Sequence, residues 1–397
     1  MCVFWRRVRI TRSAFASLVL GAAVLTFVGL PTGGGAAATA ASPSRLGVYL
    51  GYQAPSGVSS FGQTVGEQPR FAMDFLNGDS WSALVKTAPS YMAAWKKSGL
   101  RMIWGIPILP TGGSSGDSSA VASNSSFTLQ QGATGAYNSS FRKLAKDMVA
   151  GGESKSIIRL GWEFNGNWFP WSASGQAAAF VGYWRQIVDT MRSVAGQKFT
   201  FEWNPTVGVT KAGNLANFYP GSAYVDYIGL DVYDQQWGYY GAAGCQGVVC
   251  QRDEFHTILT EPDGLSWLAK FAAKEGKPIV LPEWGLGAFN PTDLSGTYQN
   301  EELGGGDDPT FIDDMAAWID AHDVFETSYW DFEPETLSVT PLSAAALRTD
   351  FGAGSSTSSG STSTGTAKLS SFGDGRASSA LLAASSPRTA NWTIRLR

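Results

Sequence analysis

Short apolar runs recur eight times along this chain, and stretches with helical periodicity separate them. This alternation constrains the fold most, because parallel strands need a crossover, usually a helix, between them. The predicted strands span residues 46–52, 71–75, 101–108, 157–163, 199–205, 224–233, 278–284 and 325–332. The main predicted helices span residues 80–98, 135–149, 175–194, 264–274 and 309–321. Eight βα units in roughly 300 residues favour a closed α/β barrel of the (β/α)8 TIM type, in one domain, over an open doubly wound sheet.

The two ends of the chain differ in composition from the barrel segment, residues 42–352. Residues 1–41 begin with several arginines, continue with an apolar run up to Pro31, and then become rich in Ala and Gly. This pattern is typical of a secretory signal peptide, with a membrane anchor as the alternative. Residues 353–397 are rich in Ser, Thr and Gly, which predicts a disordered tail. We therefore expect a secreted, extracellular protein without stable membrane association after signal cleavage.

The composition argues against some partners and favours others. The net charge is −4, and the barrel segment has no cationic cluster for a phosphate backbone, so nucleic acid is not an expected partner. Aromatic residues make up 13% of the chain and include 15 Trp, although only 16% of the residues are charged. Aromatic faces suit flat, uncharged sugars, and core packing can use the same rings. A polysaccharide is the expected partner, and a monomer is the expected state.

Cysteine and histidine are scarce. Cys245 and Cys250 are the only cysteines after the predicted signal peptide. In an oxidising compartment they are expected to form a disulfide in a Gly-rich loop, with free thiols as the alternative. His256 and His322 are the only histidines, so a His-based triad or a His-ligated metal is not expected. We expect neither a metal nor another cofactor.

Two glutamates follow apolar strands at the places where a barrel carries its catalytic groups. Glu163 ends the predicted strand 157–163, and Glu283 comes near the end of the predicted strand 278–284. Burying a carboxyl there is costly unless it is hydrogen-bonded or functional. Strands four and seven of a barrel face each other across its mouth, where two carboxyls can approach to about 5–5.5 Å, the spacing in retaining glycosidases. The pair therefore indicates glycosidase chemistry.

The two carboxyls need different protonation states for this chemistry. One must carry a proton for the leaving oxygen, and the other must be ionised to attack the anomeric carbon. The aromatic neighbours of Glu163 favour its neutral form, so Glu163 is the predicted acid/base. Arg159 or the hydroxyl of Tyr233 is expected to keep Glu283 anionic, so Glu283 is the predicted nucleophile.

The segments around both glutamates resemble glycoside hydrolase family 26, in the clan of retaining (β/α)8 glycosidases. The motif of that family is an acid/base Glu followed by Asn-Gly and an aromatic cluster, and it is matched by Glu163, Asn165, Gly166, Trp168, Phe169 and Trp171. Residues 278–285 resemble the family's nucleophile strand. The resemblance spans about residues 46–350 and implies that Tyr233 and Trp330 line the subsite beside the cleaved bond. It departs at Trp162, where mannanase members of the family carry His.

The residues expected to bind or support the substrate are Arg159, Trp162, Asn165, Trp168, Asn204, Asp231, Tyr233, Trp284 and Trp330. Core packing is the alternative for Trp284, and capping of the next turn is the alternative for Asn204. Strand alternation points Asp231 to the same side as Tyr233.

The resemblance also implies an activity. It implies cleavage of a β-linked polysaccharide by double displacement, with endo-β-1,4-mannanase activity expected first. A β-1,3-1,4-glucanase or another β-glycanase of the same family is the alternative. A catalytically silent, carbohydrate-binding envelope protein is the alternative of another class, because a fold does not guarantee an activity. The presence of both carboxyls favours the enzyme.

Overall fold

The structure is a computed structural model that describes residues 44–112, 126–208, 212–235, 248–287, 304–332 and 336–353. All of these residues belong to one compact unit, Pro43–Arg397. The predicted signal peptide and nearly all of the predicted tail lie outside the described residues. Cys245 lies outside them too, and Cys250 is described only as backbone, so the predicted disulfide also falls outside.

Parallel strands form the inner layer of this unit. They are β1 (Leu46–Tyr49), β2 (Phe71–Phe75), β3 (Arg101–Ile106), β4 (Ile157–Leu160), β5 (Thr200–Trp203), β6 (Tyr227–Gly229), β7 (Val232–Tyr233), β8 (Ile279–Gly285) and β9 (Val324–Trp330). Each strand from β1 to β5 pairs with the next one along the chain, and β1 also pairs with β9. The sheet closes because β8 pairs with both β9 and β6.

One position of the barrel holds both β6 and β7. The short strand β6 pairs with β5 and with the start of β8, whereas β7 pairs with the end of β8. The predicted strand 224–233 is therefore interrupted at Leu230 and Asp231. With β6 and β7 counted as one position, the nine strands form a closed eight-stranded parallel barrel. This architecture confirms the predicted (β/α)8 fold.

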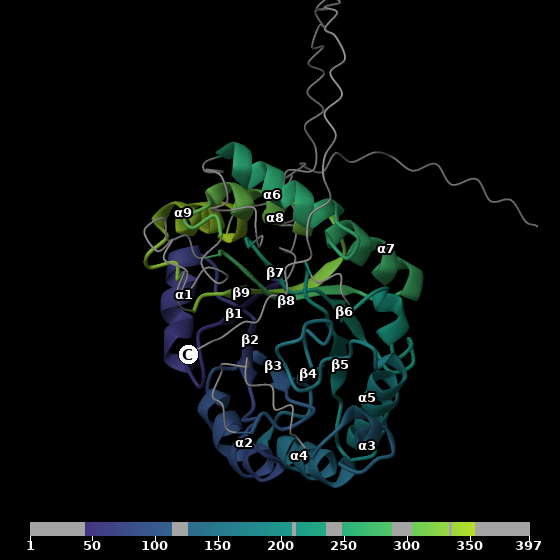
Figure 1. Cartoon of the computed structure of the whole chain (residues 1–397). Coiled ribbons are helices and arrows are strands. Elements are labelled where there is room, and N and C mark those ends of the chain that lie inside the picture. Colours follow the sequence, from purple (N-terminus) through teal and green to yellow (C-terminus); the bar gives the residue numbers. More distant parts are fainter. Residues whose placement is uncertain are drawn as a thin grey trace, which may run out of the picture. The chain divides into compact units, whose positions relative to one another are not determined.

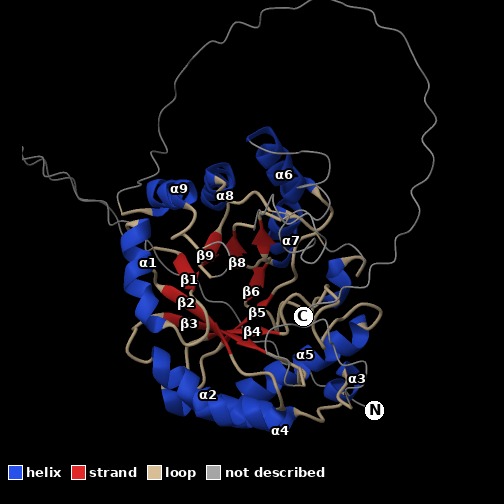
Figure 2. Ribbon diagram, turned by 60° about the vertical axis from the view of Figure 1, so that its left-hand side comes forward, coloured by secondary structure: helices blue, strands red, loops and turns tan. Residues whose placement is uncertain are grey.

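Helices surround this barrel, as Figures 1 and 2 show. They are α1 (Val58–Val65), α2 (Trp81–Trp95), α3 (Leu129–Ala133), α4 (Asn138–Gly151), α5 (Ala177–Arg192), α6 (Val248–Thr260), α7 (Leu265–Glu275), α8 (Pro309–Ala321) and α9 (Pro341–Phe351). Short 3-10 helices span Pro55–Gly57 and Leu215–Phe218. Each barrel strand thus returns to the sheet through an outer helix or loop, as a parallel barrel requires.

Side-chain caps explain where the best-predicted helices begin. Ser80 Oγ accepts a hydrogen bond from Ala83 N at 3.0 Å, which caps α2. Asp308 caps α8 in the same way, and Pro309 takes the first helical position. The predicted set lacks α1, α3, α6 and α9. Of these, α1 and α3 are only 8 and 5 residues long, too short to give a clear helical period.

Much of the tryptophan content belongs to the core. The fully buried Trp side chains are Trp95, Trp104, Trp171, Trp184, Trp203 and Trp284. Trp203 shows the pattern, because its indole packs against Phe271 of α7 and donates to the carbonyl of Phe218 at 3.1 Å. Each such ring contributes on the order of 4–6 kcal/mol of apolar burial. Core packing, the other use that the composition allows for these rings, therefore accounts for part of the aromatic content.

Candidate active site

Glu163 lies in a turn just beyond β4. The strand ends at Leu160, so the structure corrects the expectation that Glu163 is its last residue. Gly161 and Glu163 adopt left-handed backbone conformations, with φ of 52° and 50°. This conformation costs a residue other than Gly about 1–2 kcal/mol, so the surrounding structure must hold it. Backbone hydrogen bonds from Glu163 N to Asn204 O and from Gly166 N to Glu163 O, at 3.0 and 2.9 Å, are part of that support.

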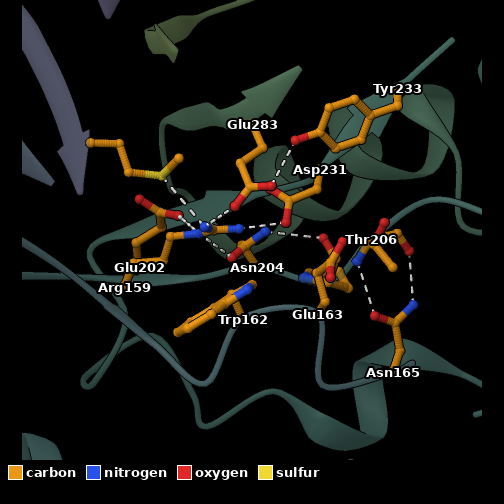
Figure 3. A network of polar contacts seen from close by, with 12 residues as sticks. Arg159, Trp162, Glu163, Asn165, Glu202, Asn204, Thr206, Asp231, Tyr233 and Glu283 are labelled. Carbon is orange, nitrogen blue, oxygen red and sulfur yellow. Dashed lines mark hydrogen bonds and ion pairs between the residues drawn. The ribbon is translucent and has the colours of Figure 1, made fainter. Parts of the chain in front are cut away.

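Asn165 ties the same turn to the segment after β5. Its Nδ2 donates to Thr206 O at 2.8 Å, and its Oδ1 accepts from Thr206 N at 2.9 Å. Asn165 is buried, and Figure 3 shows the two bonds side by side. Trp171 adds a third constraint, because its indole N–H donates to the carbonyl of Trp162 at 2.7 Å. The Asn-Gly and aromatic motif thus fixes the direction in which Glu163 projects.

The environment of the Glu163 carboxyl favours its neutral form. Burial, and then the negative charge of Glu283, raise the pKa of Glu163 to about 7. The indole N–H of Trp168, which donates to Glu163 Oε2 at 2.7 Å, opposes this shift, and so does the positive charge of Arg159. A proton is therefore available on Glu163 near neutral pH.

Glu283 is bound by donors that favour its anionic form. It lies on β8 and is buried, and its Oε1 accepts a hydrogen bond from Arg159 Nη1. The hydroxyl of Tyr233, on β7, donates to the other oxygen, Oε2, at 2.8 Å. Figure 3 shows both donors converging on this carboxylate. The cation and the hydroxyl stabilise the charge and fix the carboxylate plane.

Arg159 on β4 organises the floor of the site. Its Nη2 contacts Asp231 Oδ2, and its Nε donates to Asn204 Oδ1 at 2.8 Å. Its Nε also lies 3.5 Å from the Oε1 atom of Glu202, on β5. The Arg159 side chain is fully buried, so its charge depends on these partners rather than on water. One guanidinium therefore orients Glu283 and two further acids.

Aromatic rings form a continuous wall beside these charges. Trp330 of β9 packs on Tyr49 of β1, with ring centroids 4.1 Å apart. Tyr49 contacts Phe75 of β2 at 5.3 Å, and Phe75 contacts Trp162 at 4.8 Å. Trp162 in turn contacts Phe169 at 5.0 Å and lies under the Arg159 guanidinium. Tyr49, Phe75 and Trp162 are buried, whereas Phe169 and Trp330 at the two ends are partly exposed. The ends of this wall therefore offer apolar faces next to a polar centre, a combination that suits a sugar ring.

The structure brings together most of the residues predicted from sequence. The contacts given above link Glu163, Glu283, Arg159, Trp162, Trp168, Asn204, Asp231 and Tyr233. The rings of Trp330 and Tyr233 also meet, with their centroids 6.0 Å apart. Asn165 acts on the backbone rather than on the site itself. The Oδ1 atom of Asn204 accepts from Arg159, and its Nδ2 donates to the Pro205 carbonyl at 3.1 Å, so Asn204 supports the site through Arg159.

Trp284 is the exception. It is fully buried and contacts Phe311 of α8, Tyr329 of β9 and Phe351 of α9. Its ring thus lies between the barrel and the outer helices, because consecutive residues of a strand point to opposite faces. The prediction that it binds or supports the substrate is corrected to a packing role.

Glu202 and Thr206 belong to the site but are not among the residues predicted from the sequence. Thr206 holds Asn165 through its backbone, and a side-chain hydrogen bond from Thr206 lowers the pKa of Glu163, but a lone Thr after a strand carries no clear signal in the sequence. Glu202 does carry one, because it stands alone as a charge within the apolar strand Thr200–Trp203. Burial raises the pKa of Glu202 to about 7, against the charge of Arg159. Neither of its carboxylate oxygens has a hydrogen-bond partner in the described part of the chain.

Among the described residues, no group of three or more His, Cys, Asp or Glu side chains is arranged to hold a metal ion. None of the described helices is long and apolar enough to cross a membrane. His322 stacks on Trp318, and its Nδ1 lies 2.7 Å from the Trp318 carbonyl oxygen, at the end of α8.

Comparisons with known proteins agree with this geometry. Residues 131–265 match the model of glycosyl hydrolase family 26. Endoglucanase H of Acetivibrio thermocellus is 25% identical over 334 residues, which cover 79% of this chain and 31% of that protein. Mannan endo-1,4-beta-mannosidase of Bifidobacterium adolescentis is 28% identical over 179 residues, which cover 44% of this chain and 16% of that protein. This chain therefore spans less than a third of the length of either relative.

A solved structure extends the comparison to the fold. The structure of GH26C from Muricauda sp. superposes with a TM-score of 0.53 at 17% identity and covers 79% of this chain and 86% of that one. At this identity the likeness concerns the fold alone. It agrees with the closed barrel, and the matched segment 131–265 contains both Arg159 and Glu163.

Proposed function

Since this chain is related to glycosyl hydrolase family 26, we propose that it is a glycosidase that hydrolyses a β-linked polysaccharide with retention of anomeric configuration. The contrast between the two carboxyls carries the proposal. The pKa of Glu163 is raised to about 7, whereas Glu283 is held by a cation and a hydroxyl donor. A proton donor beside an ionised nucleophile is what double displacement requires.

In the first step, Glu283 attacks the anomeric carbon. The bond between that carbon and the leaving oxygen breaks, and Glu163 gives its proton to this oxygen. The products are a glycosyl ester on Glu283, a released sugar hydroxyl and an anionic Glu163. The N–H of Trp168 is placed to stabilise this new anion, since it already donates to Glu163 at 2.7 Å.

In the second step, the anionic Glu163 takes a proton from water. The oxygen of this water attacks the anomeric carbon, and the ester bond to Glu283 breaks. Two inversions at one carbon give net retention. Arg159 and Tyr233 stabilise the Glu283 carboxylate as it leaves, with the same contacts that orient it as a nucleophile.

We propose a β-1,4-mannan as the first candidate substrate, acted on in endo fashion. Mannan endo-1,4-beta-mannosidase is the relative with the higher identity, at 28%. A β-glucan is the second candidate, because the relative that covers 79% of this chain is named Endoglucanase H. The aromatic wall is compatible with either polymer, because both polymers are uncharged and the wall consists of uncharged rings.

The cellular setting is also a proposal. A signal peptide over residues 1–41 and secretion of a monomeric barrel are consistent with a polymeric substrate, which is too large to enter a cell intact. The test is the location of activity. Enzyme that accumulates in the medium and begins near residue 42 supports secretion, and activity retained inside the cells contradicts it.

The roles of the two carboxyls can be tested with an aryl β-glycoside whose leaving group needs no proton. With azide present, Glu163→Ala is expected to form a β-glycosyl azide, because azide replaces water in the second step. Under the same conditions Glu283→Ala is expected to form an α-glycosyl azide, because azide then attacks in place of the nucleophile. Glu275→Gln, at the end of α7, is the matched control and should behave as the wild type. Exchanged products would contradict the assignment.

The substrate can be tested with mannan, glucomannan, mixed-linkage glucan and xylan in parallel. Release of reducing ends from mannan, lost in both Glu163→Gln and Glu283→Gln, supports the first candidate. Release from mixed-linkage glucan alone supports the second. Binding of a polymer without release of reducing ends, by a protein that also leaves aryl glycosides intact, would support the silent binding protein instead.

A further inference from the structure

Tyr52 is an aromatic side chain exposed at the mouth of the barrel. It follows β1, and 59% of its surface is exposed. Its ring meets Tyr49 at 6.4 Å and Phe75 at 6.3 Å, both in edge-to-face geometry. Those two buried rings belong to the aromatic wall, so Tyr52 extends the wall outward into solvent. Single exposed rings are common on protein surfaces, so the contact of Tyr52 with this wall, rather than its exposure alone, makes its position informative.

A buried carboxylate fixes the loop that carries this ring. Asp74, on β2, is fully buried. Its Oδ2 accepts from Gln53 N at 3.0 Å and from the Trp95 indole at 2.6 Å, and its Oδ1 accepts from Phe75 N at 2.7 Å. The carboxylate thus links the residue after Tyr52 to the barrel. Three donors offset the cost of burying this carboxyl group.

The backbone on both sides of Tyr52 is unusual. Gln53 has a φ of 51°, a left-handed conformation that costs a residue with a side chain about 1–2 kcal/mol. Gly51 has a φ of 92°, and a Cβ atom there would lie 2.7 Å from the ring of Phe332. The loop is therefore held at the barrel rim by two contacts: Gly51 packs closely against the ring of Phe332, and Gln53 N donates to the buried Asp74. Tyr52 is held in place rather than left to move freely.

We propose that Tyr52 is a stacking platform for a glycosyl unit of the substrate, on the glycone side and beyond the unit at the cleaved bond. This inference rests on the proposed glycosidase function. A rigidly held ring, exposed at the end of the aromatic wall, binds a sugar face at low entropic cost. Tyr52 is thereby a residue that determines how many sugar units the site recognises.

The glycone side follows from the position of the two carboxyls. Glu163 protonates the leaving oxygen, so the leaving group must lie beside the turn that follows β4. Tyr52 follows β1, which pairs directly with β9, and β9 pairs with the nucleophile strand β8. In the other direction around the sheet, β4 lies three strand positions from β1, beyond β2 and β3, whereas β8 lies only two positions away, beyond β9. Tyr52 therefore lies nearer to Glu283 than to Glu163 along the barrel rim.

The test uses aryl glycosides that carry one to four β-linked sugar units, all of them on the glycone side of the cleaved bond. With Tyr52→Ala, we expect kcat/KM to be unchanged for one unit and to fall about tenfold for three and four units. Tyr52→Phe keeps the ring and should retain most of the activity on the longer substrates. Leu342→Ala is the matched control, because Leu342 is an equally exposed apolar side chain, at 60%, on α9.

The outcomes separate the inference from the proposed function. If the wild type cleaves the aryl glycosides and Tyr52→Ala loses activity equally on all lengths, or on none, the platform is wrong and the glycosidase stands. A Tyr52→Ala defect that appears only with added units on the leaving-group side would also contradict the platform. If the wild type cleaves no aryl glycoside and no polymer, the proposed function itself fails.

Discussion

The indole N–H of Trp168 donates a hydrogen bond to the Oε2 atom of Glu163, five positions earlier in the chain, at 2.7 Å. The bond stabilises the anionic carboxylate and so opposes the effect of burial, which raises the pKa of Glu163 to about 7. The motif that positions Glu163 therefore also limits its basicity. Removing this hydrogen bond is therefore the most direct way to change the pH dependence of the activity.

Replacing Trp168 by Phe should shift the basic limb of the pH–activity profile to higher pH. Loss of the donor destabilises the Glu163 anion, which raises its pKa further, so the proton is retained to higher pH. A hydrogen bond to a charged group is worth about 1.5 kcal/mol, which corresponds to a shift of about one pH unit. The measurement is kcat/KM against pH for an unactivated substrate. Trp267→Phe, on α7, is the control and should leave the limb in place.

Replacing Asn165 by Ala should destabilise the protein and reduce kcat. The change leaves the buried N–H and carbonyl of Thr206 without their partner, which costs about 2–4 kcal/mol in the free energy of unfolding. Denaturant unfolding measures this cost, and Asn77→Ala, at an exposed bond to Asp79, should cost well under 1 kcal/mol. An Asn165→Ala protein with native stability and full kcat would show that the clamp is unimportant.

Replacing Arg159 by Met should be severe for both stability and activity. The change leaves Glu283, Asp231 and Glu202 as buried acids without their cation, which costs about 3–5 kcal/mol. Arg159→Lys keeps the charge but cannot reach several acids at once, so it should recover part of the stability and little of the activity. Thermal unfolding and kcat/KM of the wild type, Arg159→Lys and Arg159→Met test these expectations. A kcat/KM of Arg159→Lys equal to that of the wild type would contradict them.

Replacing Glu202 by Gln should change how stability depends on pH. Burial raises the pKa of Glu202 to about 7, above its value in the unfolded chain. The protonated form is therefore favoured by folding, and its contribution is lost as the pH rises from about 4.5 through 7. Glu202→Gln has no proton to lose, so its free energy of unfolding should fall less over this interval, by about 1–3 kcal/mol. Parallel pH profiles for both proteins would contradict the raised pKa.

The sequence predicts the fold well because the alternation of apolar strand segments with helical segments depends only on local periodicity. The strand Phe71–Phe75 and the helix Pro309–Ala321 have the predicted bounds, since turn residues and a capping Asp308 end the patterns sharply. The interruption of the sixth strand at Leu230 and Asp231 is different. It depends on how β8 pairs with two short strands, which no local pattern records.

The site is predictable where a side chain acts through its chemical type. Glu163, Glu283, Arg159 and Tyr233 belong to this group. The left-handed turn at Glu163 is not predictable, because it is held by distant partners such as Asn204. Core packing, the alternative for Trp284, agrees with strand alternation, because the residue after an inward-facing glutamate on a strand points outward.

The central claim is that Glu283 becomes covalently bonded to the sugar, while Glu163 donates a proton in the first step and accepts one in the second. An activated 2-fluoro glycoside slows the second step and should trap the intermediate. Mass spectrometry of the digested protein should then find one added glycosyl unit on the peptide that contains Glu283, and none in Glu283→Gln. A trapped sugar on another residue, or active enzyme that turns over without any adduct and releases the inverted anomer, would contradict the account.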